Sequence, residues 1–154
     1  MDFKLTDKPI DGAALMAGLR DTRAGACVAF EGRVRGESGG RAVTALDYEA
    51  YAPLAEKEGE RILSEAREKF GVTGAVCAHR TGSLALGETA VWVAVAAGHR
   101  DAAFKACRYI IDETKARVPI WKREHYADGA TEWVSCATRA GTAGGGAGGG
   151  KNAG

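Results

Sequence analysis

The sequence predicts one domain that contains both helices and strands. Residues 91–97 are short and uniformly apolar and end at Gly98, which is typical of a strand buried on both faces. Residues 26–35 instead alternate between apolar and polar, as a half-buried strand does. Residues 53–70 and 101–118 repeat apolar side chains at three- and four-residue steps, the pattern of an amphipathic helix. A chain of 154 residues has room for one such domain.

The N-terminal part is expected to form an edge strand, a short helix and a hairpin. Residues 2–5 can form the edge strand, and Asp11 can cap the helix. After the alternating strand, the glycine-rich residues 36–40 predict a turn, and residues 42–48 its partner strand. Arg35 then lies at a strand end beside a glycine loop, where a guanidinium can bind an anion through two hydrogen bonds, although an exposed arginine without a ligand is more common there.

The longest predicted helix has clear signals at both ends. Pro53 suits its first turn, and Gly71 is a fitting stop. Residues 72–79 should follow as a strand and residues 80–84 as a turn. We interpret the His79-Arg80 pair as structural or as part of an interface. The predicted buried face of the helix consists of Leu54, Ile62, Leu63, Ala66 and Phe70.

Residues 98–124 are the most informative stretch for function. Asp101 is the predicted N-cap of the next helix, and Pro119 should end that helix because a proline disfavours helical geometry in the residue before it. His99 and Arg100 would then lie at the helix N-terminus. Unpaired backbone N–H groups and the positive end of the helix dipole favour a phosphate or carboxylate there.

Two lysines follow this helix start. Lys115 lies in the last helical turn, and Lys122 lies in a segment that alternates as a strand, with Glu124 on the same face and Arg123 on the other. From spacing alone, the first lysine could simply complement the helix dipole and the other charges could be solvated. The pattern by itself therefore indicates an anion site only weakly.

Charge and cysteine content exclude several classes of protein. The 21 Lys and Arg nearly balance the 20 Asp and Glu, which argues against nucleic acid or an anionic membrane as a partner. No signal-peptide pattern and no run of 18 apolar residues occurs, so we expect a soluble cytoplasmic protein. The four cysteines are far apart, with no Cys-x-x-Cys pair, and we interpret them as reduced and mostly buried thiols. We expect neither a metal site nor a bound cofactor.

The C-terminal end changes in composition. An Asp128-Gly129 turn should lead to a last strand at residues 131–134. The glycine-rich composition then predicts a domain over residues 1–139 and a flexible tail over residues 140–154.

Six motifs, in this order along the chain, resemble the large, catalytic subunit of molybdopterin synthase, the MoaE-type family. The resemblance covers roughly residues 25–134. It implies an α+β fold, an α/β-hammerhead with an additional small antiparallel sheet, and a homodimer within a heterotetramer. The motifs are residues 30–35, 46–51, 79–82, 87–88, 98–104, and Lys115 followed by residues 118–124.

The resemblance also implies a reaction and roles. Each subunit would bind a small ubiquitin-like sulfur-carrier subunit and transfer sulfur from its C-terminal Gly-Gly thiocarboxylate to cyclic pyranopterin monophosphate, forming the dithiolene of molybdopterin. Lys115 would be a general acid and base or a transient acyl acceptor, and Lys122 would stabilise negative charge. The expected substrate or carrier-tail contacts are Arg35, His99, Arg100 and Arg123.

One departure and one alternative stay open. Family members often carry a further basic residue after the last Trp-Val pair, whereas here the next cation is Arg139, so a basic contribution from that strand is open. The alternative is a non-catalytic module that holds an anionic ligand or an acidic peptide tail in the same cationic pocket. Retention of both lysines together with the His99-Arg100 pair favours the enzyme.

Overall fold

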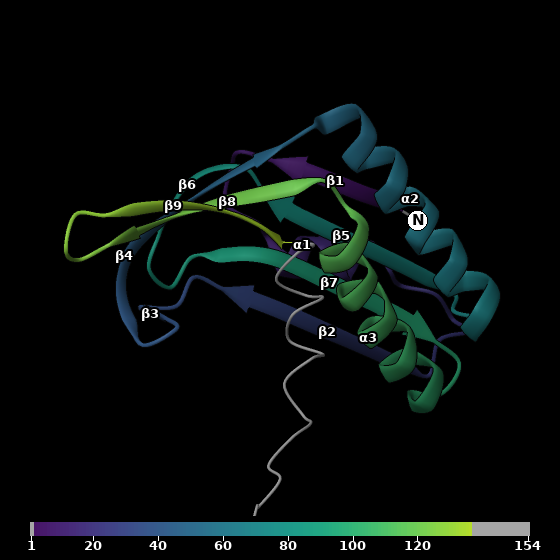
Figure 1. Ribbon diagram of the computed structural model, residues 1–154. Coiled ribbons are helices and arrows are strands. Elements are labelled where there is room, and N and C mark those ends of the chain that lie inside the picture. Colours follow the sequence, from purple (N-terminus) through teal and green to yellow (C-terminus); the bar gives the residue numbers. More distant parts are fainter. Residues whose placement is uncertain (1, 137–154) are drawn as a thin grey trace, which may run out of the picture.

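Two β-sheets meet in the fold, and two long helices cover one of them (Figure 1). The computed structural model describes residues 2–136, so the predicted boundary after residue 139 and the predicted flexible tail lie outside the described part. The first sheet has the order β1-β5-β7-β2, with β1 parallel to β5 and the other pairs antiparallel. Its strands are β1 (Asp2–Thr6), β5 (Gly74–Arg80), β7 (Thr89–Ala97) and β2 (Ala26–Arg33).

The helices pack on both faces of this first sheet. On one face α2 (Ala52–Phe70) lies against β1 and β5, and α3 (Arg100–Arg117) lies beside α2 against β7 and β2. The short helix α1 (Gly12–Ala17) packs on the other face, where Trp92 lies close to its first residue. Every residue from Ala90 to Ala97 is buried, which confirms the prediction of a central strand.

The second sheet extends beyond the ends of the helices (Figure 1). Its main order is β3-β4-β8-β9, and β6 pairs with the other edge of β4. The expected additional sheet is therefore present, and the α+β class is confirmed. The strands are β3 (Glu37–Ser38), β4 (Arg41–Ala50), β6 (Gly82–Ala85), β8 (Ile120–Tyr126) and β9 (Thr131–Ser135).

Several local predictions are confirmed and three are wrong. Gly71 ends α2 in a left-handed conformation at φ +64°, as predicted. The N-cap of α3 is His99, two residues before the predicted Asp101, which lies in the first helical turn instead. Leu54 is exposed, because it lies on the solvent side of the first turn of α2, whereas its neighbour Ala55 is the buried residue of that turn. The predicted turn at residues 80–84 contains β6, whose partner β4 is distant in sequence.

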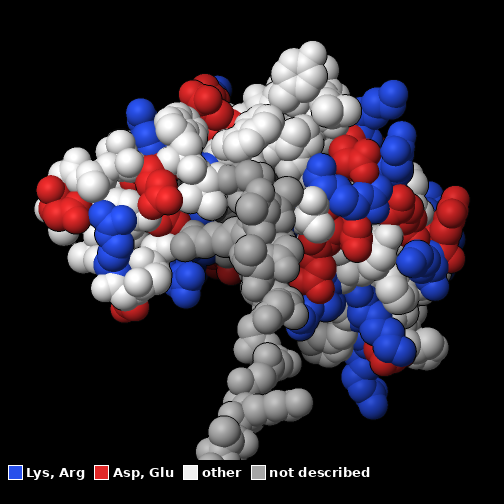
Figure 2. Space-filling view, in the orientation of Figure 1, with Lys and Arg blue, Asp and Glu red and all other residues white. Residues whose placement is uncertain are grey.

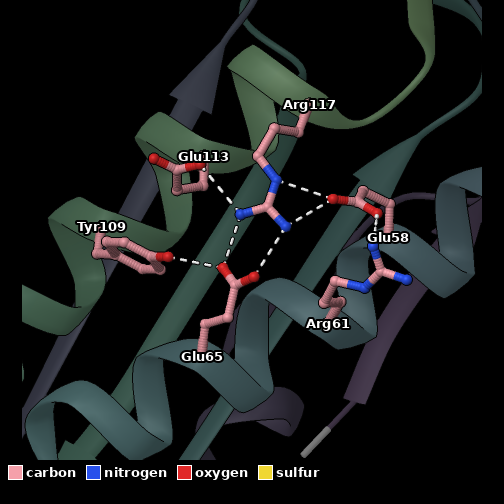
Figure 3. A network of polar contacts seen from close by, with 6 residues as sticks. All are labelled: Glu58, Arg61, Glu65, Tyr109, Glu113 and Arg117. Atoms are coloured by element: carbon pink, nitrogen blue, oxygen red, sulfur yellow. Dashed lines mark hydrogen bonds and ion pairs between the residues drawn. The ribbon is translucent and has the colours of Figure 1, made fainter.

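A charged network joins the two long helices near the end of α3 (Figure 3). The guanidinium of Arg117 lies 2.6 Å from a carboxylate oxygen of Glu58, 2.6 Å from one of Glu65 and 3.1 Å from one of Glu113. The hydroxyl of Tyr109 donates to Glu65. Hydrogen bonds from Arg117 and Tyr109 lower the pKa of Glu65 to about 2. The network thus holds the last turn of α3 against α2.

The surface shows no large field of one sign on the face drawn in Figure 2, where blue and red side chains are interspersed over the helices. This agrees with the nearly balanced composition. No helix in residues 2–136 is long and apolar enough to cross a membrane.

Candidate functional site

Three of the predicted site residues meet at one cavity. Lys115 comes from the last turn of α3, Lys122 from β8, and Arg35 from the segment that follows β2. The cavity has a volume of about 270 Å³, and we call it the cationic cavity. A smaller hollow of about 120 Å³ shares the same three cations. The other residues that line the cationic cavity are Tyr48, His79, Val91, Ile111, Thr114, Ile120 and Cys136.

The reversal of the chain after α3 explains why the two lysines meet. The helix is capped at Val118, and Pro119 separates it from β8, which begins at Ile120. The carbonyl of Pro119 accepts a hydrogen bond of 3.3 Å from the amide of Tyr51, which ties the reversal to the end of β4. Lys115 and Lys122 therefore face the same space from opposite sides of one turn.

A buried carboxylate holds Lys122. The Lys122 Nζ lies 3.2 Å from an oxygen of Glu124, whose side chain is only 1% exposed. The hydroxyls of Ser38 and Tyr126 donate to the same carboxylate at 3.1 and 2.5 Å. A buried charge persists when it is paired and hydrogen bonded, as Glu124 is. The predicted face shared by Lys122 and Glu124 is confirmed, and the two side chains form an ion pair there.

His79, which the sequence indicated as structural, lines the cationic cavity. Its ring is buried, 7% exposed, and packs edge-on against Tyr48 with ring centroids 5.0 Å apart. The Nδ1 lies 2.8 Å from the backbone carbonyl oxygen of Arg80. Burial lowers the pKa of His79 to about 4, and the positive charge of Lys115 acts in the same direction. The ring is therefore neutral at neutral pH.

His99 and Arg100 do not reach the cationic cavity of their own chain. They begin α3, whereas Lys115 lies near its end. At 1.5 Å per residue, the fifteen-residue separation from Arg100 to Lys115 corresponds to about 22 Å along the helix axis. The pair stays exposed at the helix N-terminus, where an anion is favoured.

Arg123 also lies outside the cationic cavity. It is on the opposite face of β8 from Lys122, and its guanidinium lies 2.7 Å from a carboxylate oxygen of Asp47. The same guanidinium lies over the ring of Trp133, 5.0 Å from its centroid. These contacts occupy the side chain on the outer face of the second sheet.

The cysteines are free thiols, and their burial differs. Cys77 and Cys107 are buried, and burial raises the pKa of these thiols to about 12 and about 11. Such thiols remain protonated at neutral pH and are poor nucleophiles. Cys27 is exposed, contrary to the general expectation, because β2 is the edge strand of its sheet. Residues 2–136 contain no cluster of three or more His, Cys, Asp or Glu that could hold a metal ion.

Comparison with known proteins gives a consistent family. The model of the MoaE protein family matches residues 5–117. The molybdopterin synthase catalytic subunit of Thermoplasma volcanium is 45% identical over 130 residues, which cover 84% of this chain and 95% of that protein.

Solved structures agree with this result. The crystal structure of molybdopterin synthase from Staphylococcus aureus matches with a TM-score of 0.81 and 36% identity, covering 86% of this chain and 96% of that one. A complex of subunits 1 and 2 of the molybdopterin-converting factor from Helicobacter pylori shares the fold, with a TM-score of 0.68, 21% identity and coverage of 86% and 88%. The chain therefore belongs to the MoaE family, the family of the catalytic subunits of molybdopterin synthase.

Proposed function

We propose that this chain transfers sulfur from the C-terminal thiocarboxylate of a small carrier subunit to cyclic pyranopterin monophosphate, forming the dithiolene of molybdopterin. The observation that carries the proposal is the convergence of Lys115, Lys122 and Arg35 on one cavity. Such a cavity suits two anionic reactants, a thiocarboxylate and a cyclic phosphate. The two-subunit complex of the Helicobacter pylori relative supports a small-subunit partner.

The two lysines have different surroundings, which suggests different roles. Lys122 is paired with the buried Glu124, which holds its ammonium in place. It is suited to stabilising negative charge on the acyl oxygen or the phosphate. No ion pair of Lys115 is found within residues 2–136, so its amine is available for proton transfer or acyl capture. The thiocarboxylate sulfur bonds to a substrate carbon while a carbon–oxygen bond at that carbon breaks and the leaving oxygen takes up a proton. The bond between sulfur and the acyl carbon then breaks as water or Lys115 takes the acyl group, and a second carrier repeats both steps to complete the dithiolene.

A second copy of the chain would supply the missing His99 and Arg100. Because α3 separates this pair from Lys115 by about 22 Å, one chain cannot place all three on one substrate. We propose that the expected homodimer brings the pair of one copy to the lysines of the other. Mixing Lys115→Ala chains with His99→Ala/Arg100→Ala chains should then restore one intact site and part of the activity. Activity no higher than that of either variant alone would contradict this arrangement.

A single-turnover assay tests the reaction itself. Thiocarboxylated carrier and cyclic pyranopterin monophosphate are mixed with wild type, with Lys115→Ala and with the control Lys105→Ala, whose exposed lysine pairs with Asp101 on α3. Wild type and the control should form dithiolene product, whereas Lys115→Ala should form none and still bind carrier. Binding of the pterin by wild type without product would instead favour the non-catalytic module, and loss of carrier binding in Lys115→Ala would contradict its chemical role.

A further inference from the structure

One wall of the cationic cavity presents a neutral hydrogen-bond acceptor. The Arg80 carbonyl can only accept a hydrogen bond, so the proton of the neutral His79 ring must be on Nδ1. The other ring nitrogen, Nε2, then carries a lone pair and no proton. Within the part of the chain that the structure describes, no side chain or backbone group donates to Nε2.

The surroundings of His79 fix this tautomer and the orientation of the ring. Arg80 is the last residue of β5, where the register places it opposite Thr6 of β1, so its carbonyl belongs to a paired strand. The Arg80 guanidinium is itself buried, donating to the carbonyl of Asp7 at 3.3 Å and lying 3.8 Å from Glu88. Tyr48 supports the ring from the side. The Nδ1 edge is held by the strand and His79 lines the cationic cavity, so Nε2 is the ring nitrogen that can meet a ligand there.

We propose that His79 is a substrate-binding residue whose Nε2 accepts a hydrogen bond from an N–H or NH₂ group on a heterocyclic ring of the substrate, while Arg35, Lys115 and Lys122 hold the anionic group. The inference rests on the proposed function for the identity of the pterin substrate. A cavity lined only by cations would bind free phosphate as readily as the substrate. The fixed lone pair of His79 would add selectivity for a ligand that carries both a hydrogen-bond donor and an anionic group.

Two substitutions separate the roles of the two ring nitrogens. In His79→Asn the side-chain amide nitrogen lies near the position of Nδ1, so the bond to the Arg80 carbonyl is kept and the acceptor in the cavity is lost. In His79→Gln the longer side chain places an amide oxygen near the position of Nε2, so the acceptor is kept and the bond to Arg80 is lost. His125→Asn is the matched control, because His125 pairs with Asp47 outside the cavity.

The dissociation constants of cyclic pyranopterin monophosphate and of inorganic phosphate would be measured by calorimetry for all four proteins, together with thermal unfolding and the single-turnover rate. We expect His79→Asn to weaken pterin binding by roughly 5- to 150-fold, the effect of one lost hydrogen bond and one unpaired donor. His79→Gln and His125→Asn should bind the pterin nearly as wild type does. Phosphate binding should be the same in all four proteins.

Other results would overturn the proposal. A larger loss in His79→Gln than in His79→Asn, or an equal loss in both, would mean that the ring only supports β5. An altered pH profile of the single-turnover rate with unchanged pterin affinity would mean that His79 acts on Lys115 instead. If wild type binds the pterin but forms no product, the sulfur transfer fails while the affinity comparison still decides the role of His79. If wild type binds phosphate but no pterin, both proposals fail.

Discussion

Replacement of Arg117 by methionine is expected to destabilise the protein more than the loss of an exposed ion pair would. The change keeps the aliphatic part of the side chain and removes only the charge that joins Glu58, Glu65 and Glu113 (Figure 3). Glu65 and Glu113 would lose their ion-pair partner, and Glu58 would keep only Arg61, at 3.4 Å. The two long helices would then repel each other at the turn that carries Lys115.

The magnitude follows from the burial of the network. Exposed ion pairs contribute about 0.2–1 kcal/mol each, whereas breaking a buried pair costs about 3–5 kcal/mol. The Arg117 side chain is 27% exposed, between these limits, and it makes three pairs. We therefore expect a loss of about 2–3 kcal/mol in the free energy of unfolding. For a domain of this size the melting temperature would fall by roughly 4–12 °C.

Urea unfolding followed by circular dichroism measures this difference, with Arg108→Met as the matched control. Arg108 is on the same helix, and its ion pair with Asp112 is exposed on both sides. The loss of this pair should cost only about 0.2–0.5 kcal/mol. If Arg117→Met were no less stable than Arg108→Met, the network would contribute nothing and the reasoning from burial would be wrong.

Three further predictions concern acid, the core and the site. The stability difference between wild type and Arg117→Met should shrink as pH falls from about 4.5 towards 2. The lowered pKa of Glu65 means that its carboxylate stabilises the fold above this range, and protonation removes this contribution within the range. Urea midpoints at several pH values measure the difference, and a constant difference would contradict the prediction. Gly59→Ala should destabilise by about 1–3 kcal/mol in the same assay despite the better helix propensity of alanine, because its Cβ would overlap the Phe3 ring, and a gain in stability would contradict the packing. Glu124→Gln should slow the single-turnover rate roughly 10- to 100-fold by releasing Lys122, and an unchanged rate would show that the carboxylate does not position the lysine.

The long elements and part of the site could be predicted from the sequence because their signals are local. Pro119 ends the helix of Lys115 as predicted, and the strand of Lys122 follows it, whereas the joint role of the two lysines was implied only by the family resemblance. The alternation of β8 correctly placed Lys122 and Glu124 on one face. The same alternation placed Arg123 on the other face, and its partner Asp47 is 76 residues away in sequence, which no local pattern reveals.

The features that sequence reasoning missed depend on contacts between distant segments. The strand β6 forms because it can pair with an edge of β4, and no pattern within residues 82–85 predicts that partner. His79 faces the cavity because β5 ends beside β4 and Tyr48. The sequence showed only a histidine beside an arginine at a strand end. That pattern does not distinguish a histidine that stabilises the fold from one that binds a ligand. The membership of His99 and Arg100 in the site stays a prediction, since it depends on a second copy.

The alternating faces of β8 also make the composition of the cationic cavity sensitive to the length of the segment before Lys122. Lys122 and Arg123 are neighbours that face opposite sides of the second sheet. An insertion of one residue between Pro119 and Lys122 would turn each side chain to the other face. The sequence would still contain both cations, and it would still match the family. The side chain in the cavity, however, would be Arg123 and not Lys122. In a variant of this chain, the number of residues from Pro119 to Lys122 should therefore be compared as well as the presence of both lysines, because an odd change in that number would move Lys122 out of the cavity.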